Sequence, residues 1–303
     1  MDGIVVIDKE KGVTSQRIVT EVKRVLNVGR AGHTGTLDPF ATGVLPVCLG
    51  EARKVIPFLD DNTKEYEAVL MLGIETDTMD ATGRVVYENK VNNLALSDIV
   101  DIFSKYRGEI KQIPPMFSSL KKDGVRLYDL ARKGITVPRP ARTVLIEKIR
   151  LLDYSHPFIR FFVRCSRGTY VRVLGSDIAK EFGYGGHLTE LRRIRSGIFR
   201  IEDSLLMQNL KSGNFRLIYM AEALSNINEI HVTEKVAVKI REGKQIRKSD
   251  LSWTDMRGFE VGDKLKICEN RRVVSVAQAL VGSNELYKLD DQGIVFKLLR
   301  VFN

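Results

Sequence analysis

The sequence has few cysteines and histidines, and their spacing excludes several kinds of site. Among 303 residues there are three cysteines and four histidines. Cys48, Cys165 and Cys268 are odd in number and far apart, so they favour neither a disulfide framework nor a paired-cysteine metal site, and they fit a reducing compartment. The histidines lack metal-ligand spacing, and the glycines at 29–35 are not followed by the Lys-Ser/Thr pair of a phosphate-binding loop. We therefore expect no metal and no bound cofactor.

Long apolar runs are also missing. No stretch of about 18 apolar residues occurs that could span a bilayer. The apolar run at residues 3–7 is too short, and acidic residues flank it too closely, for a signal peptide. We therefore expect a cytoplasmic protein without membrane contact.

The charge balance is basic. Lys and Arg together number 48 against 38 Asp and Glu, which gives a net charge of +10. Such an excess favours an anionic partner, and nucleic acid is the commonest choice. A membrane-surface protein or a merely solvated basic face would also fit, so composition does not decide among them.

Periodicity predicts an α+β fold with a mainly antiparallel sheet. Residues 3–8 read as a buried strand, and Thr14 precedes a helix with apolar residues at helical spacing. Residues 65–72 alternate as a strand that ends at Gly73, and residues 83–87 are predicted to be its hairpin partner. Strands and helices mix without a regular βαβ rhythm, which favours α+β.

A domain boundary is predicted near residue 230, where the pattern weakens. Residues 1–229 would form the larger domain and residues 230–303 a small all-β module. Its predicted strands are short runs at residues 236–238, 264–268, 273–276 and 294–298.

Residues 32–43, GHTGTLDPFATG, place a single carboxylate in a loop. Gly32, Gly35 and Gly43 permit unusual backbone angles, and the proline after Asp38 disfavours a helical conformation at the aspartate. The loop leads into the apolar run at residues 44–49, which would anchor it. Taken alone, an Asp-Pro pair in such a loop most often serves only to form a turn.

The whole twelve-residue stretch closely resembles the signature loop of the TruB family of tRNA pseudouridine synthases. Further matches follow in the family's order: KEY at 64–66, TDTMD at 76–80, QIPP at 112–115, LYDLAR at 127–132, RGTYVR at 167–172 and LRR at 191–193. Residues 240–246, 261–263 and 297–302 are similar to the PUA-type domain that many bacterial members carry. The resemblance implies isomerisation of uridine 55 in the T-loop, with the tRNA T-arm as partner and no DNA. We expect a monomer.

The resemblance also implies roles for three catalytic residues. Asp38 would be the nucleophile, with attack at ribose C1′, attack at base C6 and abstraction of a ribose proton all left open. Arg172 would keep that carboxylate charged. Tyr66 would stack on the target uracil and assist proton transfer at C5.

Substrate contacts are implied for three more residues. Tyr170 and Leu191 would pack around the base, and His33 would contact the RNA where a nucleotide has flipped out. Three basic clusters are candidates to track phosphates, although any one of them alone is more often a solvated face: Arg192, Arg193 and Arg195; Lys121 and Lys122; and Lys244, Arg247 and Lys248.

Two positions depart from the family pattern, and two other functions stay open. Glu10 stands where proline is usual, and Phe117 where tyrosine is usual. A guide-RNA-dependent synthase would share the aspartate loop but often has charged tails that this sequence lacks. A non-catalytic RNA-binding or RNA-folding protein would not need Asp38, Tyr66 and Arg172 together.

Overall fold

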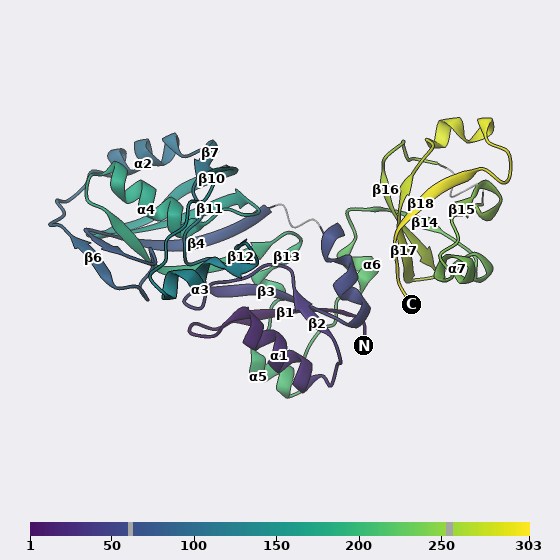
Figure 1. Cartoon of the computed structure of the whole chain (residues 1–303), viewed down its shortest axis with the longest axis horizontal. Coiled ribbons are helices and arrows are strands. Elements are labelled where there is room, and N and C mark those ends of the chain that lie inside the picture. The colour runs from purple at the N-terminus through teal and green to yellow at the C-terminus, as the bar shows by residue number, and fades with distance from the viewer. Residues whose placement is uncertain (60–62, 253–256) are drawn as a thin grey trace.

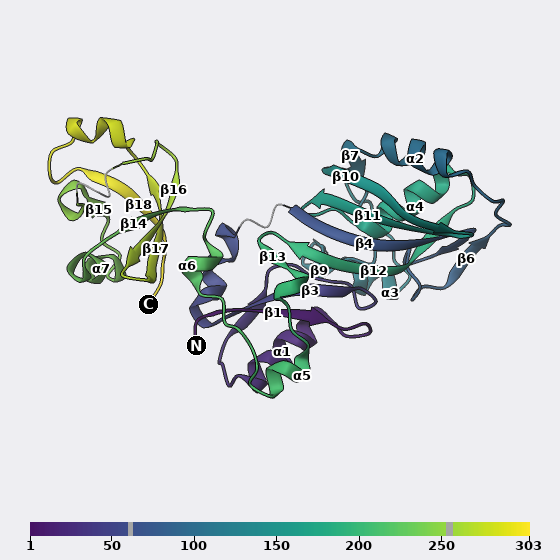
Figure 2. The ribbon, with the colours of Figure 1, turned by 180° about the vertical axis from the view of Figure 1, so that it is seen from behind.

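The structure, a computed structural model, describes residues 1–59, 63–252 and 257–303 and contains two separate main sheets (Figures 1 and 2). The larger sheet has the strand order β1-β3-β12-β4-β11-β10-β7, with β2 paired to β3 and β13 to β12. Its strands are β1 (Gly3–Lys9), β2 (Ala31–His33), β3 (Thr42–Leu49), β4 (Thr63–Leu72), β7 (Gly108–Gln112), β10 (Arg142–Ser155), β11 (Phe158–Ser166), β12 (Gly186–Ser196) and β13 (Phe199–Arg200).

Most helices of this part of the chain pack against this sheet. In the described part the helices are α1 (Ser15–Val25), α2 (Leu96–Lys105), α3 (Leu127–Arg132), α4 (Val171–Glu181), α5 (Met207–Lys211) and α6 (Met220–Ala223). Of these, α1, α2, α4, α5 and α6 contact strands of the sheet, and α3 lies elsewhere in the same part of the chain. The helix predicted after Thr14 is confirmed, since the Thr14 side chain accepts a hydrogen bond from the Arg17 amide. α4 packs on β12, and α2 packs on β10 (Figure 1).

The predicted alternation of β4 is confirmed, but its predicted hairpin partner is wrong. Tyr66 and every second residue after it are buried on one face of β4. β4 pairs with β11 and β12, whereas β6 (Val85–Glu88) pairs with β5 (Ile74–Thr76) in a two-stranded sheet of its own. Gly73, with φ +87°, turns the chain out of the large sheet and into this separate ribbon. A second ribbon pairs β8 (Lys121–Lys122) with β9 (Val125–Arg126).

The C-terminal part contains the second sheet, in the order β14-β16-β17-β18-β15. Its elements are β14 (Asn228–His231), α7 (Glu234–Arg241), β15 (Ile246–Arg247), β16 (Lys264–Glu269), β17 (Arg272–Ala279) and β18 (Ile294–Val301). The predicted fold class is confirmed. The run at residues 236–238 is nevertheless helical, because Val236, Ala237 and Ile240 bury one face of α7.

A shared apolar cluster connects the two parts of the chain. Ile4 and Cys48 of the first sheet belong to the same buried cluster as Cys268 and Phe302 of the C-terminal part. The division into residues 1–229 and 230–303 stays a prediction. Wherever the boundary lies, the two parts are joined by apolar contacts as well as by the continuous chain.

Candidate active site

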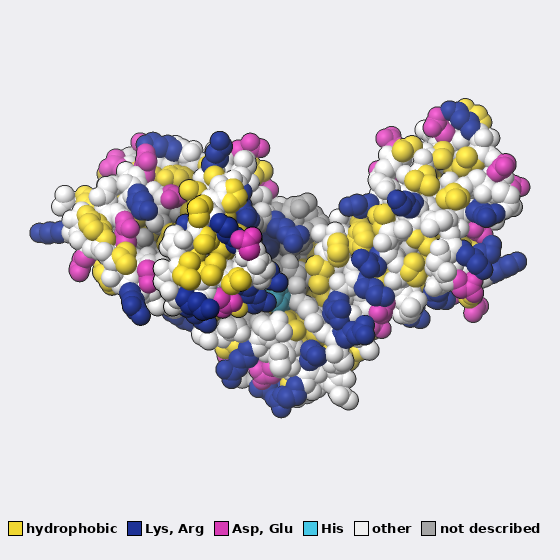
Figure 3. All heavy atoms as spheres, in the orientation of Figure 1, with side chains coloured by type: hydrophobic (Ala, Val, Ile, Leu, Met, Phe, Trp, Pro, Cys, Tyr) yellow, Lys and Arg dark blue, Asp and Glu magenta, His cyan; other side chains and the backbone are white. Residues whose placement is uncertain are grey.

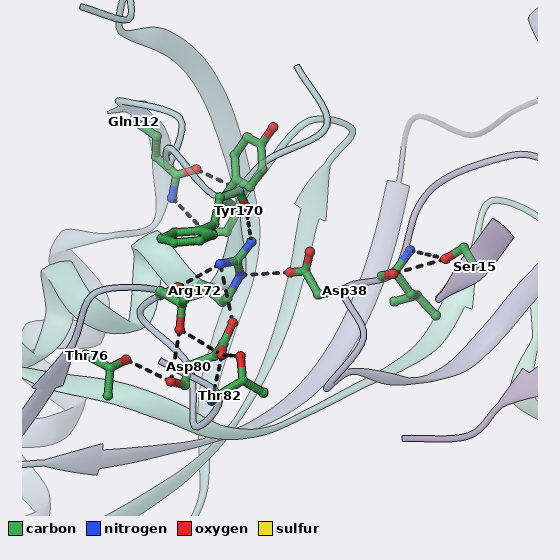
Figure 4. Close-up of polar contacts among 11 residues, drawn as sticks. Ser15, Asp38, Thr76, Asp80, Thr82, Gln112, Tyr170 and Arg172 are labelled. Carbon is green, nitrogen blue, oxygen red and sulfur yellow. Dashed lines mark hydrogen bonds and ion pairs between the residues drawn. The ribbon is translucent and has the colours of Figure 1, made fainter. Parts of the chain in front are cut away.

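Asp38 lies in the loop between β2 and β3, which is held on both sides of the aspartate. The buried Ser15 hydroxyl accepts a hydrogen bond from the Leu37 amide at 2.9 Å and donates to the Leu37 carbonyl at 3.0 Å (Figure 4). The Nζ of buried Lys9 donates to the carbonyl of Pro39 at 3.3 Å. These contacts fix the backbone directly before and after Asp38 and so limit the positions of its carboxylate.

Arg172 joins three separate segments around this carboxylate. Its Nε donates to Asp38 Oδ2 at 2.7 Å, Nη1 to the Thr78 carbonyl at 2.7 Å, and Nη2 to the Phe117 carbonyl at 2.9 Å (Figure 4). The side chain is only 3% exposed and comes from the first turn of α4. The structure thus brings Asp38 and Arg172 together. Residue 117 contributes its backbone carbonyl, so this contact does not depend on the usual tyrosine side chain.

Asp80 is a second carboxylate in the network, and the sequence pattern predicts no role for it. Its Oδ2 lies 3.4 Å from Arg172 Nη1, and its Oδ1 accepts hydrogen bonds at 2.9 Å from the Thr78 hydroxyl and from the Thr82 amide. Met79 between them has φ +60°, which bends the backbone sharply. The sequence did contain a signal for Asp80, because this carboxylate ends the matched motif at residues 76–80, which also contains two threonines.

Tyr66 lies in a row of residues that crosses three neighbouring strands. It is directly opposite Arg193 of β12, which is in turn opposite Gly43 of β3, at the end of the Asp38 loop. Burial raises the pKa of Tyr66 to about 12; the adjacent Arg193 guanidinium opposes this rise, and Asp38 adds to it. Tyr66 therefore keeps its proton at neutral pH and lies within the field of Asp38.

The prediction that Arg193 tracks phosphates is wrong, because its side chain is fully buried. Its Nε donates to the Val44 carbonyl at 2.8 Å and its Nη2 to the Gly35 carbonyl at 3.0 Å. Its neighbours in the predicted cluster also have protein partners. Arg192 pairs with Asp8 at 2.7 Å, and Arg195 Nε donates to the Gly197 carbonyl at 2.7 Å. Arg193 lies on β12 in the middle of the sheet, which explains its burial.

His33 is half-buried at the end of β2. Burial lowers its pKa, and the nearby positive charges of Arg193 and Lys64 lower it further. The imidazole is therefore neutral at pH 7. A neutral ring suits stacking on a nucleobase, the role predicted for His33.

Tyr170 and Leu191 occupy two different places. Tyr170 precedes α4, where its amide donates to the Gln112 side chain at 3.1 Å, next to Arg172 (Figure 4). Leu191 is buried on β12 opposite Ala68. It also lines a cleft of about 180 Å³. None of Asp38, Tyr66 and Arg172 is among the residues that line this cleft.

The surface carries many basic groups. Lys and Arg side chains gather in the lower middle of Figure 3 and continue toward the C-terminal part. Within residues 1–59, 63–252 and 257–303, no helix is long and apolar enough to cross a bilayer. In the same ranges no three His, Cys, Asp or Glu side chains group as metal ligands would.

Comparisons with known proteins point in one direction. Residues 23–171 match the TruB family pseudouridylate synthase N-terminal domain, and residues 172–225 match the tRNA pseudouridylate synthase B C-terminal domain. The chain is 42% identical to tRNA pseudouridine synthase B of Geobacter sulfurreducens and 38% identical to that of Syntrophus aciditrophicus. In both cases at least 99% of each chain is covered.

A solved structure shares the fold. The structure of a Cbf5-Nop10-Gar1 complex matches 99% of this chain and 85% of the matched chain, with a TM-score of 0.73 and 26% identity. The site geometry, the full-length relatives and the two family domains agree, and this chain therefore belongs to the TruB family of pseudouridine synthases.

Proposed function

We propose that this protein isomerises uridine to pseudouridine in tRNA, with Asp38 as the attacking group. The observation that carries the assignment is the 2.7 Å contact between Asp38 Oδ2 and Nε of the buried Arg172. Only Oδ2 of this carboxylate is hydrogen-bonded to a described residue, which leaves Oδ1 for the substrate. The family resemblance selects uridine 55 of the T-loop as the target.

The reaction breaks the N1–C1′ bond, turns the base and joins C5 to C1′. C5 loses a proton and N1 gains one, so atoms balance without an oxidant or a cofactor. The base must first leave the stack, because the reacting atoms are inaccessible in folded RNA. The protein then has to supply an attacking carboxylate and to retain the detached base while it turns.

The described residues can divide these tasks. Arg172 fixes the orientation of the Asp38 carboxylate through a charge-assisted hydrogen bond. Tyr66 is buried beside that carboxylate and offers an aromatic face and a hydroxyl. Tyr170 and Leu191 are proposed to pack around the base, and His33 to contact the RNA next to it.

We also propose RNA contacts for the C-terminal sheet, which we take as PUA-like. The three basic residues predicted to meet phosphate there have protein partners. Lys244 pairs with Glu242 at 2.6 Å, Lys248 donates to the Leu289 carbonyl at 2.7 Å, and Arg247 contacts Gln292. Lys244 remains exposed and can exchange its partner for a phosphate. The reaction is proposed to take place in the cytoplasm, in a monomeric enzyme.

The test uses purified protein and an unmodified tRNA transcript with no other RNA. Carbodiimide treatment followed by primer extension should reveal one new pseudouridine, in the T-loop. Modification that requires an added guide RNA would support a guide-dependent synthase instead. Binding without any modification would support an RNA-folding protein and refute the proposal.

A further inference from the structure

Arg193 connects the Asp38 loop to the neighbouring strand. It is fully buried, and its Nε and Nη2 donate to carbonyls on either side of Asp38, Val44 at 2.8 Å and Gly35 at 3.0 Å. Gly43 comes so close to the Arg193 backbone that an added Cβ would lie 2.1 Å from its carbonyl oxygen. One guanidinium thus fixes both ends of the loop that carries the proposed nucleophile.

The third nitrogen of this guanidinium, Nη1, is buried and has no hydrogen-bond partner among the described residues. Buried donors are nearly always satisfied, so an unpaired one in a functional site calls for an explanation. Tyr66 is the residue directly across from Arg193 on β4, and side chains at such positions are immediate neighbours. Arg193 lowers the pKa of Tyr66, by its charge and by a side-chain hydrogen bond, and Asp38 raises it, so the phenol lies near both charges.

The chemistry of the two groups fixes the direction of the contact. A guanidinium can only donate, so in any hydrogen bond between them the phenol oxygen accepts. The phenol proton must then point away from Arg193. Other charged or titratable groups near this pair are Asp38 from the loop, Cys165 from β11, and Lys9, Lys64 and His33 around Arg193.

We propose that Arg193 is a positioning residue that directs the hydroxyl proton of Tyr66 toward the bound uracil. The proposal rests on the proposed function. Whichever route Asp38 takes, a carbonyl oxygen of the base gains negative charge, either when N1–C1′ breaks with its electron pair or when the carboxylate adds at C6. A preoriented phenol donor stabilises that oxygen without having to reorganise. Arg193 would not touch the substrate.

The test is a double-mutant cycle on the single-turnover rate of pseudouridine formation. In the otherwise native enzyme, Arg193→Gln should lower the single-turnover rate by at least about tenfold. In the Tyr66→Phe enzyme, the fold reduction caused by Arg193→Gln should be less than about a third as large. Arg160→Lys, an exposed arginine on the same sheet, is the control and should leave the rate unchanged. Equal losses in the two backgrounds would overturn the proposal and reduce Arg193 to a support of the loop.

Two further arms keep the result decisive. Arg193→Lys retains the positive charge and replaces Arg193→Gln if that variant unfolds, with the same cycle applied. The second arm uses protein with isotope-labelled arginine and intact Arg193. In its NMR spectrum, Tyr66→Phe should shift the Nη signals of a buried guanidinium other than that of Arg172. Unchanged signals would contradict the proposed contact. An inactive native enzyme would instead refute the proposed function itself.

Discussion

At the scale of single residues, the site pairs a partly exposed carboxylate with a buried guanidinium. Asp38 is 33% exposed, whereas Arg172 is 3% exposed and makes hydrogen bonds to two backbone carbonyls besides its contact with Asp38. The arginine therefore has little freedom to move, and the carboxylate that it orients can still reach a substrate. Asp80 lies behind Arg172 and balances its charge.

Replacing Asp80 should test this arrangement. Asp80→Ala removes an ionic neighbour of Arg172 and the Oδ1 acceptor of the Thr82 amide, and leaves the Thr78 hydroxyl only the backbone carbonyl of residue 80. The free energy of unfolding should fall by about 1–3 kcal/mol. Pseudouridine formation should slow by at least about tenfold, since a loss of about 1.4 kcal/mol through poorer orientation already costs that factor. Urea unfolding measures the stability and single-turnover assays measure the rate, with Asp153→Ala at an exposed position as control. An unchanged rate would show that Asp80 does not help to orient Arg172 for the reaction.

Lys9 should give stability a distinct pH dependence. Burial lowers its pKa from 10.5 to about 8, and Asp38 partly opposes that change. Between pH 8 and 10.5 the unfolded chain binds more protons at this site than the folded chain, so the contribution of Lys9 to stability rises with pH. The difference in unfolding free energy between native protein and Lys9→Met should grow by about 2 kcal/mol from about pH 7.5 to about pH 10.

Urea unfolding at several pH values measures this difference. Tyr66, Cys165 and Cys268 also titrate abnormally, because burial raises the pKa of each to about 12. They are present in both proteins, so their contributions cancel in the comparison. A difference that stays flat or falls with pH would contradict a lowered pKa at Lys9.

At the scale of elements, the catalytic loop depends on its close approach to β12. Gly43 has φ +102°, and an added Cβ would lie 2.1 Å from the Arg193 carbonyl oxygen. Gly183 offers a matched control, with φ +79° and nothing within 4 Å of an added Cβ. Gly183→Ala should cost about 1–2 kcal/mol of unfolding free energy for its backbone strain alone.

Gly43→Ala adds a collision with backbone to that strain. It should destabilise the protein by about 3 kcal/mol or more and slow pseudouridine formation, because the loop must move away from β12. Thermal unfolding and activity of the two variants are compared directly. Equal effects of the two substitutions would show that the contact with β12 does not position the loop.

Elements with a local pattern could be predicted from sequence, whereas their partners could not. The alternation of β4 and the cap at Thr14 are encoded in adjacent residues and are confirmed. The pairing of β4 with β11 and β12 joins segments that are far apart in the sequence, so the prediction of the nearer segment at residues 83–87 is wrong. Burial likewise places the run at residues 236–238 in a helix.

The site was predictable to the extent that family motifs name residues. Asp38, Tyr66 and Arg172 belong to those motifs, and the structure brings all three into one region. Asp80 and Arg193 also lie within matched motifs, but the motifs do not name their partners, which are set by tertiary contacts. An arginine is expected at the surface because most arginines are exposed, but the strand that carries Arg193 is central in the sheet.

At the scale of the whole molecule, the two sheets share apolar contacts. Ile4 and Cys48 lose buried neighbours if the chain is cut near residue 230, since Cys268 and Phe302 belong to the same cluster. A truncated protein is therefore a poor probe of RNA binding. Charge substitutions that leave this cluster intact are better suited.

The β8–β9 ribbon provides such a probe. Lys121 and Lys122 are exposed on β8, and we expect both to meet tRNA phosphates. Changing both to Gln should reduce the slope of log Kd against log salt by roughly 0.7–0.9 for each phosphate that is no longer neutralised. Filter binding from low to moderate salt measures the slope, with Lys105→Gln on α2 as control. An unchanged slope would show that this ribbon does not bind the RNA backbone.

The role of Asp38 is tested most directly by measuring both activity and affinity for Asp38→Asn. The substitution keeps the shape of the loop and removes the attacking carboxylate. Pseudouridine formation in a guide-free tRNA transcript should fall below detection, while the Kd for tRNA should stay within about threefold of the native value. Appreciable formation of pseudouridine by this variant would show that Asp38 does not carry the reaction.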